Sequence, residues 1–270
     1  MTSWTCLGKS STDTLLHAVA GSCTCLLPGH DEAVSGYLTA IGDALRCPEA
    51  GITIRPWGSE GLRCAVAQES TPREAYRRIV EYVAERAGAR GGKTVISRCI
   101  TGTFAPGTRE NFTQSLFGLF RECFRFTFSH PLCGCWAGAS PELLLHLDAQ
   151  TLDIDTQALA GTRRRGTSAP WDAKNTEEHR LVVDDMLARL GRCAGVTDVR
   201  AGKPYNRTYG DIEHLCTPIS GHLSDAAAFE STALALHPTP AVGGWPRADA
   251  LADIRRHEPH RRGFYGGTIV

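Results

Sequence analysis

The segment 124–166 most constrains how this chain can fold. It begins with phenylalanines that alternate with polar residues (FRFTF), which predicts a strand. Apolar runs at 143–147 and 152–154 predict a hairpin that turns near Asp148. Successive strands joined by such short turns pair in an antiparallel manner. We therefore expect an α+β fold and not a doubly wound α/β fold, and the chain carries no G-x-G-x-x-G nucleotide motif.

Five helices are predicted from apolar residues spaced three and four positions apart. In the first, Thr71 and Glu74 form a capping box, with Pro72 at the first helical position. The others are expected at 111–122, 175–190, 229–236 and 247–260. Residues 1–70 contain short apolar strands and turns without recognisable chemistry. We expect them to form an N-terminal part of the sheet, followed by one domain over 71–270.

Composition excludes several classes of protein. Lysine plus arginine equals aspartate plus glutamate at 29 each, which argues against a nucleic-acid-binding protein. No apolar run approaches the length of a membrane span, and the first residues do not resemble a signal peptide, so we expect a cytoplasmic protein. The 11 cysteines include no C-x-x-C pair, which favours reduced, buried thiols over a zinc site or a disulfide framework.

The stretch ALAGTRRRG carries the strongest local chemical signal. Gly161 lets backbone amides approach a ligand closely, and Thr162 supplies a hydroxyl. Three successive arginines at 163–165 add positive charge. The combination predicts a site for an anion, either a carboxylate or a phosphate.

Three further residues each allow a structural and a functional interpretation. Lys93 begins a predicted strand, KTVISR, and is either a solvated lysine or a base in a pocket that lowers its pKa. Glu142 is either an ordinary turn carboxylate or a proton donor whose pKa is raised by apolar neighbours. Glu178 either favours the dipole of the helix 175–190 or binds Mg²⁺. His214 is expected to be a hydrogen-bonded core histidine and not a ligand.

Several motifs together resemble those of chorismate-utilising enzymes, and most of all isochorismate synthases. They are ALAGTRRRG, EEHRLVVDDM, HLCTPISGHL, LHPTPAVGGWP and HEPHRRGFYGG, in this order. The resemblance extends from about Lys93 to the end of the chain. It implies antiparallel sheets sandwiched by helices, and the Mg²⁺-dependent conversion of chorismate to isochorismate. In that reaction water adds at C2 while the C4 hydroxyl leaves.

The resemblance also implies a role for each matching residue. Lys93 is the base that activates water, and Glu142 is the acid that protonates the departing hydroxyl. Glu178 is a magnesium ligand. The remaining matches are expected to contact the substrate: Gly161 and Thr162 at a carboxylate, His237 at the ring, and Tyr265 at the enolpyruvyl carboxylate.

The chain departs from the family pattern at its end. The family continues beyond RGFYGG with a carboxylate-binding arginine and a second magnesium glutamate, so we expect a truncated chain that lacks the last strands of the sheet. An inactive fragment is one alternative. A salicylate synthase and an anthranilate synthase are two others. Anthranilate synthases usually carry glutamine at the position of Lys93. The product is expected to serve menaquinone or siderophore biosynthesis, and the protein is expected to be a monomer.

Overall fold

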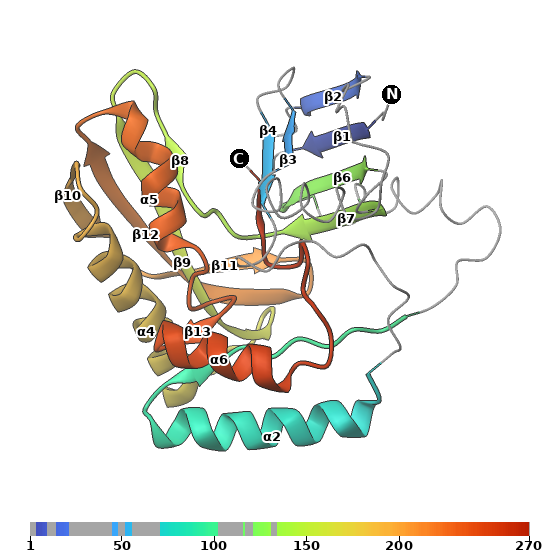
Figure 1. Cartoon of the computed structure of the whole chain (residues 1–270). Coiled ribbons are helices and arrows are strands. Elements are labelled where there is room, and N and C mark those ends of the chain that lie inside the picture. The colour runs from blue at the N-terminus through green and yellow to red at the C-terminus, as the bar shows by residue number, and fades with distance from the viewer. Residues whose placement is uncertain are drawn as a thin grey trace. The chain divides into compact units, whose positions relative to one another are not determined.

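A computed structural model describes residues 4–9, 15–21, 45–47, 52–55, 71–101, 116, 121–130 and 134–269 (Figure 1). The chain divides into two compact units. Unit 1 combines Met1–Ser70, Cys99–Pro141 and His260–Val270, and unit 2 combines Thr71–Arg98 with Glu142–Pro259. The division at residue 70 that we expected from the sequence stays a prediction.

Unit 1 contains an antiparallel sheet in the order β2-β1-β6-β7. Its strands are β1 (Trp4–Lys9), β2 (Leu15–Gly21), β6 (Phe124–His130) and β7 (Gly134–Ser140). Phe124 and Phe126 stack with 6.2 Å between ring centroids, as expected for alternate residues on one face of a strand. Gly138 lies opposite Phe126, and a Cβ atom at position 138 would come within 2.6 Å of that ring. The strand predicted from Phe124 onward is therefore confirmed.

A second, three-stranded sheet of unit 1 has the order β14-β4-β3. It pairs β3 (Leu45–Cys47) and β4 (Ile52–Arg55) with β14 (Thr268–Ile269), all antiparallel. Segments more than 200 residues apart in the sequence thus share one sheet.

Unit 2 is built on a five-stranded antiparallel sheet in the order β10-β12-β9-β8, in which β11 also pairs with β12. Its strands are β8 (His146–Leu147), β9 (Asp153–Arg164), β10 (Val196–Ala201), β11 (Tyr205–Tyr209) and β12 (Ile212–Leu223). The predicted hairpin is confirmed, because β8 pairs with the start of β9. Asp148 makes the turn by accepting hydrogen bonds from the backbone N–H groups of Gln150 (2.8 Å) and Thr151 (3.2 Å).

Helices α4 (Ala173–Leu190) and α5 (Phe229–Leu236) pack on this sheet and on each other (Figure 1). A short 3₁₀ helix, Ala226–Ala228, leads into α5. Alternate residues of β9 supply the sheet side of the core, and residues one turn apart supply the α4 side. The buried apolar cluster contains Leu145, Ile154, Ala158, Ala160, Val182, Met186, Leu190, Ile219, Leu223, Ala233 and Leu236. The ranges predicted for these two helices hold to within two residues.

Helices α2 (Arg73–Ala89) and α6 (Arg247–His257) border a two-stranded ribbon of β5 (Lys93–Thr94) and β13 (Gly244–Trp245). The predicted capping box is wrong. Pro72 occupies the N-cap, none of the described side chains caps the helix, and Glu74 instead pairs with Arg77 at 2.6 Å. The predicted strand KTVISR is shorter than expected, because only its first two residues pair as a strand.

The structure does not test the helix expected at 111–122. This range lies outside the described residues except at Leu116 and at 121–122. Among the described segments, no helix has the length and apolar character needed to cross a membrane.

Asp253 of α6 connects this helix to the end of α2 through ion pairs. Its side chain is 5% exposed and pairs with Arg90 at 2.6 Å and with Arg86 at 3.5 Å. Burial is the largest single influence and works against the charged carboxylate, but the hydrogen bond from Arg90 and the charges of Arg90, Arg86 and His257 together outweigh it, so the pKa of Asp253 is lowered. The charged form is therefore the one that stabilises the fold, and this contribution is lost as the pH falls through the lowered pKa.

We expect Asp253→Asn to reduce the free energy of unfolding by about 2 kcal/mol at pH 7, the usual magnitude for a hydrogen bond to a charged group. Urea denaturation measures this loss. Asp249→Asn is the matched control, because Asp249 is exposed on the same helix. Equal stabilities of the two variants would contradict the role of Asp253, and the difference between them should shrink below pH 4.

Candidate active site

Gly161 forms a bulge in β9. Along the β9–β12 pairing His214 lies opposite Thr162, whereas the next residue, Leu215, lies opposite Ala160, so Gly161 has no partner. Its φ of +75° belongs to the left-handed region that glycine adopts without strain. A Cβ atom here would lie 3.3 Å from the carbonyl oxygen of Asn175 in the first turn of α4. The bulge therefore allows α4 to approach the strand closely.

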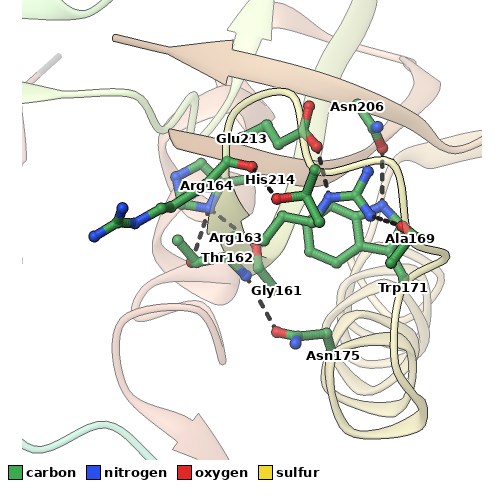
Figure 2. A network of polar contacts seen from close by, with 11 residues as sticks. Gly161, Thr162, Arg163, Arg164, Ala169, Trp171, Asn175, Asn206, Glu213 and His214 are labelled. Atoms are coloured by element: carbon green, nitrogen blue, oxygen red, sulfur yellow. Dashed lines mark hydrogen bonds and ion pairs between the residues drawn. The ribbon is translucent and has the colours of Figure 1, made fainter. Parts of the chain in front are cut away.

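Two side chains hold this bulge in place (Figure 2). Asn175 Oδ1 accepts a hydrogen bond from the Thr162 backbone N–H at 3.2 Å. His214 Nδ1 lies 2.9 Å from the Gly161 carbonyl oxygen and 3.0 Å from Thr162 Oγ1. His214 is thus hydrogen-bonded, as expected, but it is only partly buried and does not lie in the core. The Thr162 side chain is exposed, and its hydroxyl lies beside His214 at the surface of the bulge.

The three arginines that follow do not form one positive cluster. Arg163 Nε pairs with Glu213 at 2.5 Å, and its guanidinium lies 4.1 Å from the centroid of the Trp171 ring. Its Nη1 also donates to the carbonyl of Ala169 at 2.6 Å, so Arg163 holds the connection between β9 and α4 (Figure 2). Adjacent residues of a strand point to opposite faces. The anion site that the sequence predicted therefore does not gain the charge of all three arginines.

We expect Gly161→Ala to destabilise the protein more than Gly166→Ala. Both glycines have φ near +75°, so alanine costs about 1–2 kcal/mol at either position. Gly166 has open space around its Cβ position, whereas Gly161 faces Asn175. The difference between the two variants in urea denaturation measures the close approach of α4. A smaller loss for Gly161→Ala would contradict this packing.

Lys93 and Glu178 meet although 85 residues separate them in the sequence. Lys93 Nζ donates to Glu178 Oε1 at 2.7 Å, and the two side chains are 14% and 29% exposed. Lys93 is positioned by the pairing of β5 with β13, in which it lies opposite Trp245. Glu178 lies in the second turn of α4. Their pairing shows that the start of α4 and β5 border the same site.

Glu142 belongs to the same cluster. It follows β7 and is partly buried, and desolvation raises its pKa to about 7. The positive charge of Lys93 and the buried hydroxyl of Thr239 act in the opposite direction, which shows that both lie near the carboxyl group. A carboxyl group with a pKa near neutrality retains its proton at pH 7 often enough to donate it in a reaction.

His237 and Thr239 lie on the loop that joins α5 to β13. This loop contains a cis peptide bond between His237 and Pro238. Its far end, Gly244, has a φ of +129°, and a Cβ atom there would lie 2.3 Å from the Lys93 carbonyl oxygen. The loop therefore reaches both Glu142, through Thr239, and the backbone of Lys93, through Gly244.

The other predicted contact, Tyr265, lies in unit 1. It is 56% exposed, and the Arg262 guanidinium lies 5.7 Å from the centroid of its ring. Its contact with the enolpyruvyl carboxylate stays a prediction, as do the substrate contacts of Gly161, Thr162 and His237.

The described residues provide few ligands for a metal ion. No group of three or more His, Cys, Asp or Glu side chains with suitable geometry occurs among them. Glu178 supplies one carboxylate, which already binds Lys93. Mg²⁺ prefers six oxygen ligands and often keeps several waters. Glu178 therefore fits Mg²⁺ only as a single ligand beside water and substrate oxygens.

The sequence did not indicate the contacts that three residues make in this site. Asn175 and His214 hold the bulge, and Thr239 lies beside Glu142. The one available signal was for Asn175, which lies three residues after Asp172, the N-cap of α4, and donates to it through its backbone N–H. Nothing in local sequence indicated what the side chains of the other two would contact.

A sequence model described as "Chorismate binding enzyme" matches residues 58–269. The "Salicylate biosynthesis isochorismate synthase" of Pseudomonas aeruginosa is 39% identical over 145 residues, which cover 50% of this chain and 30% of that protein. "Isochorismate synthase MenF" of Bacillus subtilis is 34% identical over 145 residues, with the same two coverages. The matched segment thus covers 30% of the length of each of these relatives, and this chain is about half as long as they are.

The solved structure of MenF, the menaquinone-specific isochorismate synthase from Escherichia coli, resembles this fold with a TM-score of 0.66. The two sequences are 19% identical, and the match covers 100% of this chain and 76% of that one. At this identity the likeness concerns the fold alone. It confirms the expected α+β class with antiparallel sheets and helices.

Proposed function

Because the chain belongs to the family of chorismate-binding enzymes, we propose that it converts chorismate to isochorismate. In this reaction a water molecule adds at C2 of the ring, and the C4 hydroxyl leaves as water after it is protonated. The atoms balance, and the product is an isomer of the substrate. The reaction needs one group that takes a proton from water and one that gives a proton to the leaving hydroxyl.

The observation that carries this proposal is the nearness of an amine and a carboxyl group whose pKa is raised. Lys93 acts on Glu142 through its charge, and burial keeps the pKa of Glu142 at about 7. We assign Glu142 as the acid, since it can hold a proton at neutral pH. We assign Lys93 as the base for the attacking water. It must first lose a proton and release Glu178, to which it donates in the structure.

Substrate contacts follow from the neighbouring backbone. Chorismate carries two carboxylates, and the Thr162 hydroxyl is an exposed donor beside the bulge. We assign His237 to the ring, because it lies two residues before Thr239 on the loop that reaches Glu142. We assign Tyr265 to the enolpyruvyl carboxylate on the basis of the sequence motif RGFYGG.

Mg²⁺ is part of the proposal, with Glu178 as one of its ligands. When bound, the metal neutralises a substrate carboxylate and orients the ring. A monomeric, cytoplasmic protein is likewise still a prediction, and so is a role of the product in menaquinone or siderophore biosynthesis.

Product analysis tests the proposed reaction. The protein is incubated with chorismate and Mg²⁺, with and without an ammonium salt, and the products are separated by chromatography. Isochorismate as the sole product supports the proposal. Salicylate would indicate additional loss of pyruvate, and anthranilate formed only with ammonia would indicate the ammonia-dependent reaction. Calorimetric titration with chorismate and Mg²⁺ supplies a second criterion, because absence of both binding and product would indicate a fragment without activity.

A further inference from the structure

We infer that Arg189 is a positioning residue that sets the placement of Lys93 relative to Glu142 by holding the loop 237–244. Arg189 lies in the last turn of α4 and does not belong to the cluster around Lys93. The expected effect on kcat rests on the proposed function. The anchoring of the loop by Arg189 rests on contacts among the described residues.

Arg189 also forms a largely buried ion pair within its own helix. Its Nε pairs with Asp185 Oδ2 at 2.6 Å, one turn earlier on the same helix. The two side chains are only 11% and 12% exposed, so solvent screens the pair weakly. The guanidinium is planar, and fixing Nε fixes the direction of its remaining N–H groups.

Those remaining groups point at the end of α5. Arg189 Nη1 donates to the carbonyl oxygens of Leu236 at 3.1 Å and of Pro238 at 3.0 Å. Arg247 Nη2 donates to the intervening carbonyl, that of His237. The last carbonyl groups of a helix have no partner within the helix, and positive charge is favoured there. Two arginines therefore fix three successive carbonyl groups where α5 passes into the loop.

The loop transmits this anchoring to both groups of the proposed acid–base pair. Thr239 is the residue directly after Pro238, and its hydroxyl lies near Glu142. Thr239 O also accepts hydrogen bonds from the N–H groups of Val242 and Gly243 at 3.1 and 2.9 Å. These bonds make the segment 239–243 a compact turn, so movement at one end is passed to the other.

At its other end, the loop meets the strand that carries Lys93. The Gly243 carbonyl oxygen accepts from the Val95 N–H at 3.0 Å. Gly244 and Trp245 pair with Thr94 and Lys93. The space at Gly244 is too small for a Cβ atom, so the loop backbone packs directly against the β5 backbone there. A displacement of the anchor at Pro238 therefore changes the position of Lys93 as well as the environment of Glu142.

The test compares Arg189→Gln and Arg189→Lys with Arg180→Gln. Arg180 is the matched control. It lies on the same helix and also pairs with an aspartate of that helix, Asp184, but it is 57% exposed, and its hydrogen bonds go to Glu177 and Asp184. The protein is labelled with 5-fluorotryptophan, and the ¹⁹F signal of Trp245 is assigned among the five tryptophans with Trp245→Phe.

We expect the Trp245 signal to shift in both Arg189 variants and to stay in place in Arg180→Gln. In the kinetic assay, Arg189→Gln should lower kcat by about 100-fold, the scale of a 1 Å misplacement, with KM changed less than about threefold. Arg189→Lys keeps the charge but loses the planar fork, so its kcat should fall by about 10-fold. If Arg189→Gln does not fold, the Trp245 signal and kcat of Arg189→Lys alone test the inference.

An unmoved Trp245 signal with kcat within twofold of wild type in an Arg189 variant would overturn the inference, and so would equal effects of Arg180→Gln. The ¹⁹F signal needs no substrate. If the unmodified protein forms no isochorismate, the proposed function fails, whereas the shift of the Trp245 signal still decides whether Arg189 positions the loop.

Discussion

Lys93→Ala is expected to lower kcat by about 10²- to 10⁴-fold, the usual contribution of an acid or base, while the Kd for chorismate changes little. The reason is that no other amine is assigned to take a proton from the attacking water. Stopped assays with chromatographic detection of isochorismate give kcat, and calorimetric titration gives the Kd.

Loss of turnover in Lys93→Ala has a second possible cause, the broken pair with Glu178. Lys93→Arg separates the two causes. Arginine keeps the positive charge and can still pair with Glu178, but it cannot be deprotonated at neutral pH and so cannot act as a base. We expect Lys93→Arg to be as inactive as Lys93→Ala. Wild-type turnover in Lys93→Arg would rule out the base role. Lys203→Ala, at an exposed lysine, is the control for loss of charge and should keep full activity.

Glu142→Gln is expected to lower kcat by a similar factor, about 10²- to 10⁴-fold, because glutamine matches the size of glutamate but cannot give a proton to the leaving hydroxyl. In the unmodified enzyme, kcat/KM should decline as the pH rises above about 7, since the acid form of Glu142 is then depleted. Glu85→Gln, on an exposed part of α2, should leave the pH profile and kcat unchanged. A Glu142→Gln variant with normal turnover would show that another group supplies the proton.

The raised pKa of Glu142 also has a consequence for stability. A carboxyl group with a higher pKa in the folded state binds protons more tightly there, so its contribution is complete below the unfolded pKa and is lost as the pH rises through the folded one. The window runs from about 4.5 to about 7. The loss is roughly 3 kcal/mol at most, at 1.36 kcal/mol per pH unit. Urea denaturation at pH 5 and pH 8 should show this decline in the wild type and a smaller one in Glu142→Gln.

Local features of the fold were predictable because each depends on residues close together in the sequence. Helix α5 begins and ends where its apolar spacing indicated, and the strand from Phe124 follows its alternation of phenylalanine and polar residues. The hairpin at Asp148 depends on a side chain that bonds its own turn. The capping box failed although its sequence pattern was present. Glu74 had a competing partner, Arg77, on the next turn of the same helix.

The sequence indicated which residues are candidates for the site, but not which of them contact one another. Arg163, Arg164 and Arg165 looked like one anion site, yet Arg163 forms a pair with Glu213, which lies 50 residues away in the sequence. The motifs identified the family, which the match over residues 58–269 confirms, because several of them occur in a specific order. The assignments of Lys93, Glu142 and Glu178 as base, acid and metal ligand remain predictions for the experiments above.

The sequence alone determined which residue types are available and which backbone segments become helices and strands, since both follow from interactions over a few residues. Only the tertiary structure decided that Lys93 meets Glu178, that Thr239 lies beside Glu142, and that Arg189 reaches the loop between them. These contacts depend on how strands and helices pair across long stretches of chain. The raised pKa of Glu142 has the same origin, because desolvation is produced by all the atoms packed around a group and not by its sequence neighbours.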